Sequence, residues 1–260
     1  MDFRLIRYAA GERVARITLN RPEKRNALDE VMVGELTSAF TAAARDTNVK
    51  VVVLAGAGPA FCAGADLAQL ERMSAYDLEQ NRADSQRLAT LFRTMYELRK
   101  PVIGLVHGPA IAGGCGLASL CDFVLAARER AKFGYTEVHI GFVPAIVSVF
   151  LSKRIGEGRA RELMLRGNLL DATGAAAIGL ITAAVPDDEL ERQGTALVKE
   201  LIKENSSTAM AMTKEMFARA NGMNLADAVD FSINLNAAAR MTADCKKGVQ
   251  AFLNKQQPDW

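Results

Sequence analysis

The chain is poor in the side chains that usually bind metal ions or form disulfide frameworks. Its 260 residues include only two histidines and four cysteines. The cysteines are Cys62, Cys115, Cys121 and Cys245. No two of them form a Cys-x-x-Cys pair, and two histidines add few further ligands. A disulfide framework or a zinc site is therefore not expected, and the sequence predicts no metal.

The chain also lacks a strong excess of charge of either sign. Its 32 basic and 30 acidic residues give a net charge of +2. Proteins whose main partner is a nucleic acid usually carry a marked basic excess, so no nucleic-acid partner is expected. Because half of the residues are hydrophobic, the chain can bury a substantial core and is not expected to be disordered.

Long uninterrupted hydrophobic runs are missing too. The N-terminal stretch MDFRLIRYAAGER has no apolar run of the length of a signal peptide. Residues 103–127 are mostly apolar, but His107, Pro109, Asp122 and several glycines interrupt them. A strand, a turn and the start of a buried helix explain this stretch better than a membrane span. We therefore expect a cytoplasmic protein without a membrane partner.

What the chain does have is an alternation of strand and helix patterns. Residues 13–20 alternate as a half-buried strand does, and residues 49–56 and 101–108 are continuous β-branched or apolar runs typical of strands covered on both faces. Residues 123–127 and 179–186 predict further strands, and residues 70–99 predict one long helix. The pattern indicates an α/β fold with right-handed crossovers.

From Asp187 to Leu253 the pattern is nearly all helical, with breaks near residues 205–206 and 221–222. We therefore divide the chain into an α/β core at residues 1–186 and a helical region at residues 187–260. The apolar faces of the helical region need a cover, which either a second chain or packing within one chain provides.

Two glycine-rich loops follow predicted buried strands and lead into helices. They read GAGPAFCAGADL, from Gly56, and GPAIAGGCGLASL, from Gly108. Main-chain N–H groups at such junctions face outward without a neighbouring Cβ, and a helix start adds unsatisfied donors. Two N–H groups aimed at one point form an oxyanion hole. The alternative is that the glycines only permit tight packing of strand against helix.

Five segments resemble the crotonase (enoyl-CoA hydratase/isomerase) family, in family order and over nearly the whole chain. They are RPEKRNAL, FCAGADL, KPVIGLVHGPAIAGGCGLASLCD, KFGYTEVHIG and GVQAFLNKQQPDW. The resemblance implies a crotonase-like spiral of ββα units followed by a C-terminal helical oligomerisation region. It implies an acyl-CoA substrate, and no cofactor apart from the coenzyme A of that substrate.

The same resemblance assigns an oxyanion hole to the backbone N–H groups of Ala65 and Gly113. These groups would hold the thioester oxygen as it becomes enolate-like, with Gly113 and Gly114 giving the substrate access to the backbone. Coenzyme A would lie over Arg25 and Ala63, where Ala63 offers a main-chain contact to adenine. For Arg25, an ordinary exposed cation is the alternative reading.

Further substrate contacts implied by the resemblance lie in three other parts of the chain. Asp66 and Leu67 follow Ala65 in the same loop. Tyr135 belongs to the pocket-shaping YTEV segment. Phe252 and Lys255 would lie near the coenzyme A site of a neighbouring chain, in a homotrimer or homohexamer.

One carboxylate stands where the familiar hydratases have two. Their first glutamate corresponds to Gly116 here, and their second corresponds to Glu137. Glu137 precedes an apolar run, so burial could raise its pKa and suit it to general acid–base catalysis; a surface or capping glutamate is the alternative. His107 and Asp122 are interpreted as structural hydrogen-bonding residues, and neither His107 nor His139 is expected to bind a metal.

The missing carboxylate leaves the reaction open. The stretch VPAIVSVFLSKRIG resembles the branch that hydrates branched, carboxylated enoyl-CoAs such as methylglutaconyl-CoA, whose own carboxylate could compensate for Gly116. On that hypothesis a glutamate introduced by Gly116→Glu should favour an unbranched substrate. The alternatives are a Δ3–Δ2 enoyl-CoA isomerase with one glutamate and a non-catalytic acyl-CoA-binding subunit.

Overall fold

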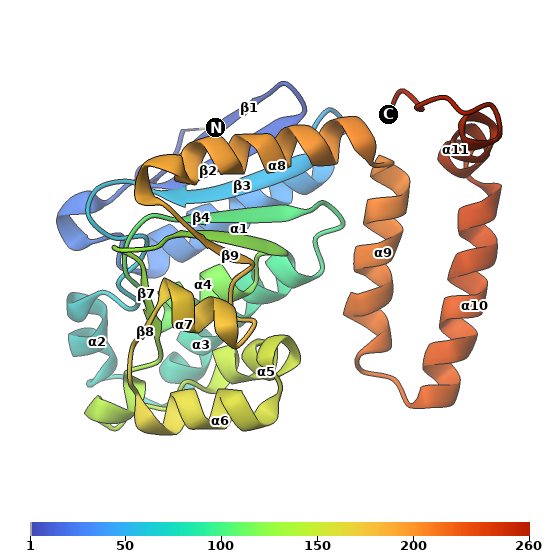
Figure 1. The fold of residues 1–260 in the computed structure, drawn as a ribbon. Helices are drawn as coiled ribbons and strands as arrows, with labels where there is room; N and C mark the ends of the chain where they lie inside the picture. Colours follow the sequence, from blue (N-terminus) through green and yellow to red (C-terminus); the bar gives the residue numbers. More distant parts are fainter. Residues whose placement is uncertain (1) are drawn as a thin grey trace.

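The computed structural model describes residues 2–260 and has a six-stranded sheet at its centre (Figure 1). In spatial order its strands are β1 (Ile6–Gly11), β2 (Val14–Leu19), β3 (Val51–Gly56), β4 (Val102–Val106), β6 (Phe123–Ala127) and β9 (Ala183–Val185). β1 and β2 form an antiparallel hairpin, and all the other neighbours are parallel. The predicted α/β fold is confirmed.

A smaller sheet stands at the carboxyl ends of the large one. It consists of β5 (Ala110–Ile111), β7 (Lys132–Gly134) and β8 (Leu170–Asp171). Two isolated parallel bridges extend it, one between Cys62 and Ala110 and one between Leu28 and Ala65. Both glycine-rich loops are thereby tied into one layer of extended backbone.

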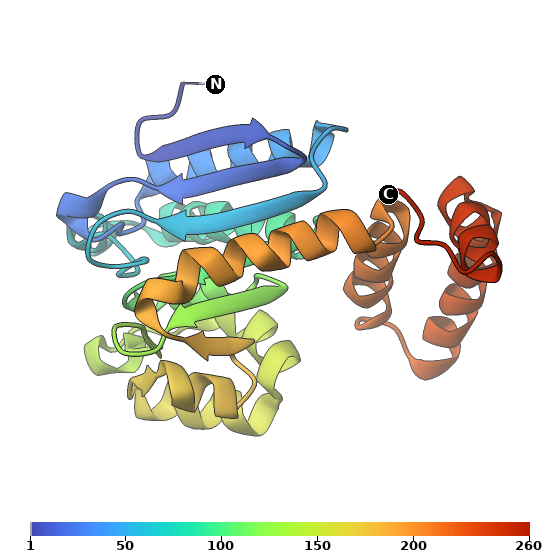
Figure 2. The same ribbon diagram turned by 45° about the horizontal axis from the view of Figure 1, so that its top comes forward.

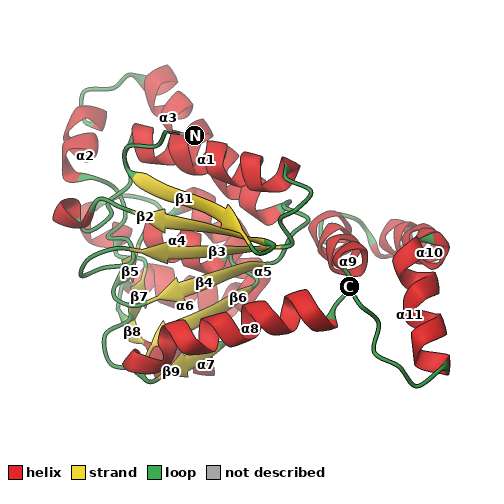
Figure 3. Cartoon of the chain, turned by 90° about the horizontal axis from the view of Figure 1, so that it is seen from above, coloured by secondary structure: helices red, strands yellow, loops and turns green. Residues whose placement is uncertain are grey.

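Helices cover both faces of the large sheet (Figure 3). Val52 and Leu54 of β3 face the core shared with α1 (Glu30–Arg45) and α3 (Leu78–Tyr96). Val51 and Val53, which point the other way, pack with residues of α8 (Leu190–Glu204). This two-sided burial explains why the central strands are continuous hydrophobic runs rather than alternating ones.

The remaining helices fill the ends of the sheets and the C-terminal region. They are η1 (Pro22–Lys24), α2 (Leu67–Met73), α4 (Gly113–Ser119), η2 (Glu137–Ile140), α5 (Ala145–Ile155), α6 (Glu157–Arg166), α7 (Ala172–Ala177), η3 (Asp187–Glu189), α9 (Ser207–Ala220), α10 (Leu225–Met241) and α11 (Ala243–Leu253).

The single helix predicted over residues 70–99 is wrong, because the chain forms α2 and α3 instead. Asp77 begins α3 with a capping box: its side chain accepts from the Gln80 N–H, and the Gln80 side chain accepts from the Asp77 N–H. Such a reciprocal cap is a strong start signal, and it interrupts the helical pattern between Met73 and Leu78.

The division at residue 187 stays a prediction, but the first helix of the predicted helical region packs on the sheet. Leu190, Val198 and Leu201 of α8 are buried in a cluster with residues of the large sheet. The projecting part is α9–α11, which has no buried residue (Figures 1 and 2). The change in packing falls at Asn205, where α8 ends.

The apolar stretch at residues 103–127 forms β4, β5, α4 and β6, as predicted for a strand, a turn and a helix start. Within residues 2–260, no helix combines the length and the hydrophobicity needed to cross a bilayer.

Candidate active site

The two glycine-rich loops run side by side where β3 and β4 end. The Cys62 N–H donates to the Pro109 carbonyl over 3.1 Å, and the Ile111 N–H donates to the Cys62 carbonyl over 2.9 Å. Gly64 has φ +91°, and a Cβ there would lie 3.0 Å from Ala112 Cβ. Ligands of parallel α/β sheets bind at this carboxyl edge, so this arrangement marks the candidate site.

The direction of the Ala65 amide follows from its neighbours. The Gly64 carbonyl accepts a hydrogen bond of 2.6 Å from the Leu28 N–H. In a trans peptide the C=O and the next N–H point in opposite directions, so the Ala65 N–H points away from Leu28. This N–H has no hydrogen-bond partner among residues 2–260. It is free to donate to a ligand.

The Gly113 amide is directed by the start of α4. The Ala112 carbonyl accepts from the Gly116 N–H over 3.0 Å along the helix, so the Gly113 N–H points out of the helix start. Ala112 adopts φ +51° and ψ −122°, a backbone conformation that costs a residue with a Cβ about 1–3 kcal/mol. In the described chain the Gly113 N–H, like that of Ala65, has no partner.

The parallel register of the two loops indicates that the Ala65 and Gly113 amides lie side by side. Cys62 pairs with Ala110 in parallel, so a step of three residues places Ala65 beside Gly113. The close approach of Gly64 to Ala112 agrees with that register.

The other glycines of α4 have no space for a Cβ. A Cβ on Gly114 would lie 2.3 Å from the Cys62 carbonyl oxygen, so Gly114 lets the helix start rest on the neighbouring loop. At Gly116, a Cβ would lie 2.6 Å from Val147 Cγ1 and 2.8 Å from the Phe92 ring. The position of the missing first carboxylate is therefore filled by two apolar side chains.

Glu137 is the first residue of η2, just beyond β7. The Gly134 carbonyl accepts from the Ala112 N–H over 2.8 Å, which holds the end of β7 beside the start of α4. The Glu137 Oε2 atom is buried and has no hydrogen-bond partner in the described chain. Burial raises the pKa of the carboxyl group above its usual value, as expected for a proton-transfer group.

Tyr135 lies two residues before Glu137 and is fully buried. Its hydroxyl group also has no hydrogen-bond partner within residues 2–260. Burial raises the pKa of the phenol well above its usual value, and the neighbouring Cys115 adds to this shift.

Comparison with known proteins identifies the family of the chain. The sequence model of the family described as enoyl-CoA hydratase/isomerase matches residues 9–260. The chain belongs to that family.

Relatives and solved structures match over nearly the whole length. A putative enoyl-CoA hydratase of Thermus thermophilus is 43% identical over 245 residues, which cover 94% of this chain and 96% of the relative. The 2,3-dehydroadipyl-CoA hydratase of Escherichia coli is 32% identical, covering 96% and 95%. A crystal structure of an enoyl-CoA hydratase of Mycobacterium smegmatis superposes with a TM-score of 0.91 at 34% identity, covering 99% of both chains. The chain is therefore a crotonase-fold enzyme of an acyl-CoA-processing family.

Arg25 and Ala63, the expected coenzyme A contacts, are neighbours in the structure. The Ala63 N–H donates to the Arg25 carbonyl over 3.0 Å, and the Arg25 side chain is exposed. Since the Ala63 N–H has a partner in the protein, the expected main-chain contact to adenine would have to use the Ala63 carbonyl oxygen.

Asp66 has a structural environment that the motif did not reveal. It is 3% exposed, and its Oδ1 accepts from the Ala68 and Gln69 N–H groups at the start of α2. Its Oδ2 lies 2.9 Å from Arg21 Nη1. Both oxygens have partners within the protein, and the substrate contact expected at Asp66 stays a prediction. Leu67, by contrast, is 82% exposed.

Phe252 and Lys255 are not brought to the site within one chain. Phe252 is 81% exposed on α11, which projects on the side of the molecule opposite α2 (Figure 1). A role near coenzyme A would therefore require a second chain.

The histidine and aspartate interpretations agree with the structure. His107 Nε2 lies 2.9 Å from the Gly58 carbonyl, an acceptor only, so this ring nitrogen donates. Asp122 Oδ2 accepts from the Val102 N–H over 2.7 Å and pairs with Lys214. The part of the chain that the structure describes contains no group of three His, Cys, Asp or Glu side chains able to hold a metal ion.

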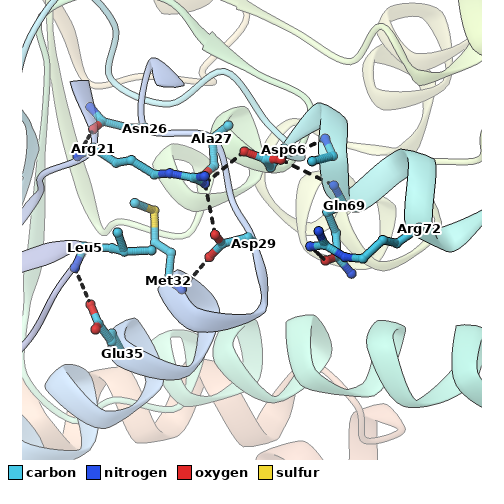
Figure 4. Close-up of polar contacts among 11 residues, drawn as sticks. Leu5, Arg21, Asn26, Ala27, Asp29, Met32, Glu35, Asp66, Gln69 and Arg72 are labelled. Carbon is cyan, nitrogen blue, oxygen red and sulfur yellow. Dashed lines mark hydrogen bonds and ion pairs between the residues drawn. The ribbon is translucent and has the colours of Figure 1, made fainter. Parts of the chain in front are cut away.

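Two residues that support the site, Asn26 and Arg21, were missed by the sequence analysis. Asn26 is fully buried, and its Nδ2 donates to the carbonyls of Ala57 and Ala60 over 2.8 and 2.9 Å. Its Oδ1 accepts from the Arg21 N–H over 2.8 Å (Figure 4). Both residues lie within the RPEKRNAL motif, but nothing in the letters alone shows which loops they connect.

Proposed function

We propose that this enzyme hydrates the 2,3-double bond of an enoyl-CoA thioester, with Glu137 as its acid–base group. The observation that carries the proposal is the buried, unpartnered Glu137 Oε2 on the segment joined to the start of α4, where the Gly113 amide is unpartnered too among the described residues. The amides of Ala65 and Gly113 would hold the thioester oxygen between them.

In the proposed reaction Glu137 removes a proton from water as the water oxygen bonds to C3. The electrons of the double bond move toward the thioester carbonyl, whose oxygen becomes enolate-like. Two fixed N–H donors stabilise that oxygen more than the ground-state carbonyl, which lowers the barrier. Glu137 then returns the proton to C2. No cofactor is required beyond the coenzyme A of the substrate.

For the substrate we propose a branched, carboxylated enoyl-CoA such as methylglutaconyl-CoA. Phe92 and Val147 fill the place of the first carboxylate and form an apolar wall beside Gly116. This wall has no polar group that could position the attacking water. A carboxylate on the substrate can supply that group. A relative is named a hydratase of 2,3-dehydroadipyl-CoA, a substrate with a terminal carboxylate.

The same apolar wall favours one second candidate, a Δ3–Δ2 enoyl-CoA isomerase. Moving a double bond needs proton removal at one carbon and proton return at another, which one carboxylate can perform. Such an enzyme has no need to hold water.

Product analysis distinguishes these reactions. Crotonyl-CoA, methylglutaconyl-CoA and a 3-enoyl-CoA are incubated separately with the enzyme and with Glu137→Gln. We expect a 3-hydroxyacyl product from methylglutaconyl-CoA at a kcat/KM above that for crotonyl-CoA. Equal rates with both overturn the substrate proposal, and a conjugated product from the 3-enoyl-CoA without hydration establishes the isomerase. Tight acyl-CoA binding with no turnover of any of the three overturns catalysis.

The structure changes one test that the sequence suggested. A glutamate at position 116 would place its Cβ within 2.8 Å of both Phe92 and Val147. Gly116→Glu would therefore disturb packing before it could supply a carboxylate. The substrate panel is the cleaner experiment.

For the assembly we propose a homotrimer, alone or paired as a hexamer, built through α9–α11. Leu225, Met241 and Phe252 are among the exposed apolar side chains of these helices. In such an assembly Phe252 and Lys255 would approach a neighbour's coenzyme A site.

A further inference from the structure

Arg21 lies between the starts of two helices that flank the candidate site (Figure 4). Its Nη1 atom is 3.0 Å from Asp29 Oδ2 and 2.9 Å from Asp66 Oδ2, and it donates to the Ala27 carbonyl over 3.3 Å. The Arg21 side chain is largely buried. One guanidinium group thus joins residues of two loops that are far apart in sequence.

Each of the two aspartates uses its second oxygen to cap a helix. Asp29 Oδ1 accepts from the Met32 N–H over 2.9 Å at the start of α1. Asp66 Oδ1 accepts from the Ala68 N–H over 2.8 Å at the start of α2. Because Arg21 holds the other oxygen of each carboxylate, it fixes the two helix starts relative to each other.

Ala65 lies inside this frame. The Leu28 N–H donates to the Gly64 carbonyl, and the Asp66 N–H donates to the Leu28 carbonyl over 2.8 Å. Leu28 directly precedes Asp29, and Ala65 directly precedes Asp66. Arg21 connects these two aspartates. The orientation of the peptide between Gly64 and Ala65 therefore depends on this frame.

We propose that Arg21 is a positioning residue that aims the Ala65 N–H at the thioester oxygen. This inference rests on the proposed oxyanion role of Ala65. Arg21 does not touch the substrate in this proposal; it acts through Asp66 and Asp29.

Charge gives Arg21 a second effect on the same atom. Asp66 is adjacent to Ala65 in sequence and is buried, so an unpaired carboxylate there would oppose negative charge on a bound thioester oxygen. Arg21 offsets that charge. A neutral side chain at position 21 would lose both the geometry and the neutralisation.

The test measures polarisation of a bound carbonyl. Wild type and Arg21→Met are saturated with butyryl-CoA labelled with ¹³C at the thioester carbonyl, and the infrared carbonyl stretch is compared with that of the free ligand. We expect a large downshift in the wild type and a clearly smaller one in Arg21→Met. We also expect kcat to fall about 10- to 100-fold with KM changed less, in line with the loss or misplacement of one oxyanion donor.

Three further variants separate positioning from stability. Asp66→Asn keeps an oxygen for the α2 cap but loses the ion pair, so its carbonyl shift should resemble that of Arg21→Met even if Arg21→Met folds poorly. Arg21→Lys keeps the charge without the planar fork and should recover part of the shift. Arg16→Met, which removes an exposed pair with Glu191, is the matched control and should leave the shift unchanged.

The outcomes distinguish this inference from the proposed function. If the wild type itself shows no downshift, the oxyanion role of Ala65 fails and the inference fails with it. If the wild type shows the downshift and both Arg21→Met and Asp66→Asn retain it with normal kcat, Arg21 is only structural. A lower melting temperature with unchanged shift and kcat likewise identifies Arg21 as a structural residue and overturns the inference.

Discussion

Glu137, the proposed proton-transfer group, has a carboxylate oxygen that is costly to bury. One of its oxygens is buried without a partner in the described chain, and burial raises its pKa. A buried polar atom left unsatisfied usually costs free energy of folding. A ligand that completes its hydrogen bonding would offset this cost, which supports the proposed acid–base role of Glu137.

Replacing this carboxylate by its amide should abolish most turnover. Glu137→Gln preserves size but cannot exchange a proton, and general acid–base groups contribute about 10²- to 10⁴-fold to rate. We expect kcat/KM to fall by that factor while the dissociation constant of butyryl-CoA, measured by calorimetry, stays within about twofold. A loss of binding equal to the loss of rate would instead identify Glu137 as a substrate contact.

The same substitution should alter the pH dependence of stability. A folded-state pKa above the unfolded one means that the folded protein holds the proton more tightly in the interval between the two. Stability from this group is full below the unfolded pKa and is lost as pH rises through the folded pKa. Glu137→Gln lacks this loss, so its stability relative to wild type, measured by urea unfolding, should increase as pH rises above the unfolded-state pKa of about 4.5. An identical pH profile for both proteins would contradict the raised pKa.

At the scale of the element, α4 begins at a proposed oxyanion donor and is anchored at its other end. Its first residue, Gly113, has an amide N–H without a partner among residues 2–260. At its last turn Arg154 donates to the carbonyls of Ser119 and Cys121 over 3.3 and 2.7 Å, and to that of Leu180 over 2.7 Å. A cation at a helix C-terminus offsets the negative end of the dipole and satisfies orphan carbonyls.

Removing that anchor should destabilise the protein. Arg154→Met leaves three carbonyls without a partner, and we expect a loss of about 3 kcal/mol in the free energy of urea unfolding. Arg159→Met is the matched control, because Arg159 is exposed and donates to a single carbonyl, that of Ile178. Its loss should stay below about 1 kcal/mol. If both variants lose the same free energy of unfolding, the Arg154 contacts with α4 contribute no more to stability than an exposed arginine does.

The contact of α4 with α3 and α5 explains why position 116 is glycine. Gly116→Ala should cost about 1–3 kcal/mol by overpacking against Phe92 and Val147. Adding Val147→Ala should restore part of that loss, since it removes the closest atom. Gly158→Ala in α6, where nothing lies within 4 Å of the added Cβ, should stabilise by about 0.5–1 kcal/mol. Thermal or urea unfolding measures the stability of these variants. An unchanged stability of Gly116→Ala would show that Phe92 and Val147 move to make room for the added Cβ.

At the scale of the whole molecule, local sequence patterns predicted the strands well, but they did not predict contacts between residues that are distant in the sequence. Strands such as 51–56 were visible because burial on both faces makes them continuous apolar runs. The environment of Asp66 was not visible, because Arg21, its partner, lies 45 positions away and belongs to another loop. The wall at Gly116 was also hidden, since Phe92 and Val147 come from other helices. Motifs locate chemistry, whereas burial and pairing depend on tertiary contacts.

The C-terminal region also shows that a local helical pattern does not reveal which helices pack on the core. The sequence from residue 187 is nearly all helical in pattern. In the structure, however, α8 packs on the sheet, whereas α9–α11 project from the core. The C-terminal tail returns to α8, where Trp260 Nε1 donates to the Glu204 carbonyl over 2.9 Å. The projecting helices are thus held to the core at their end while their apolar side chains stay exposed. Exposed apolar surface of this extent marks an interaction site.

This surface leads to a prediction about assembly. If α9–α11 join copies of the chain, light scattering of the wild type should give about three or six times the chain mass of 28.1 kDa. Ile233→Asp puts a charge on the exposed face of α10 and should shift the protein toward smaller species. Leu165→Asp does the same on exposed α6 and is the matched control; it should leave the mass unchanged. A wild type that scatters as a monomer at micromolar concentration would refute assembly through these helices, and equal effects of the two variants would place the interface elsewhere.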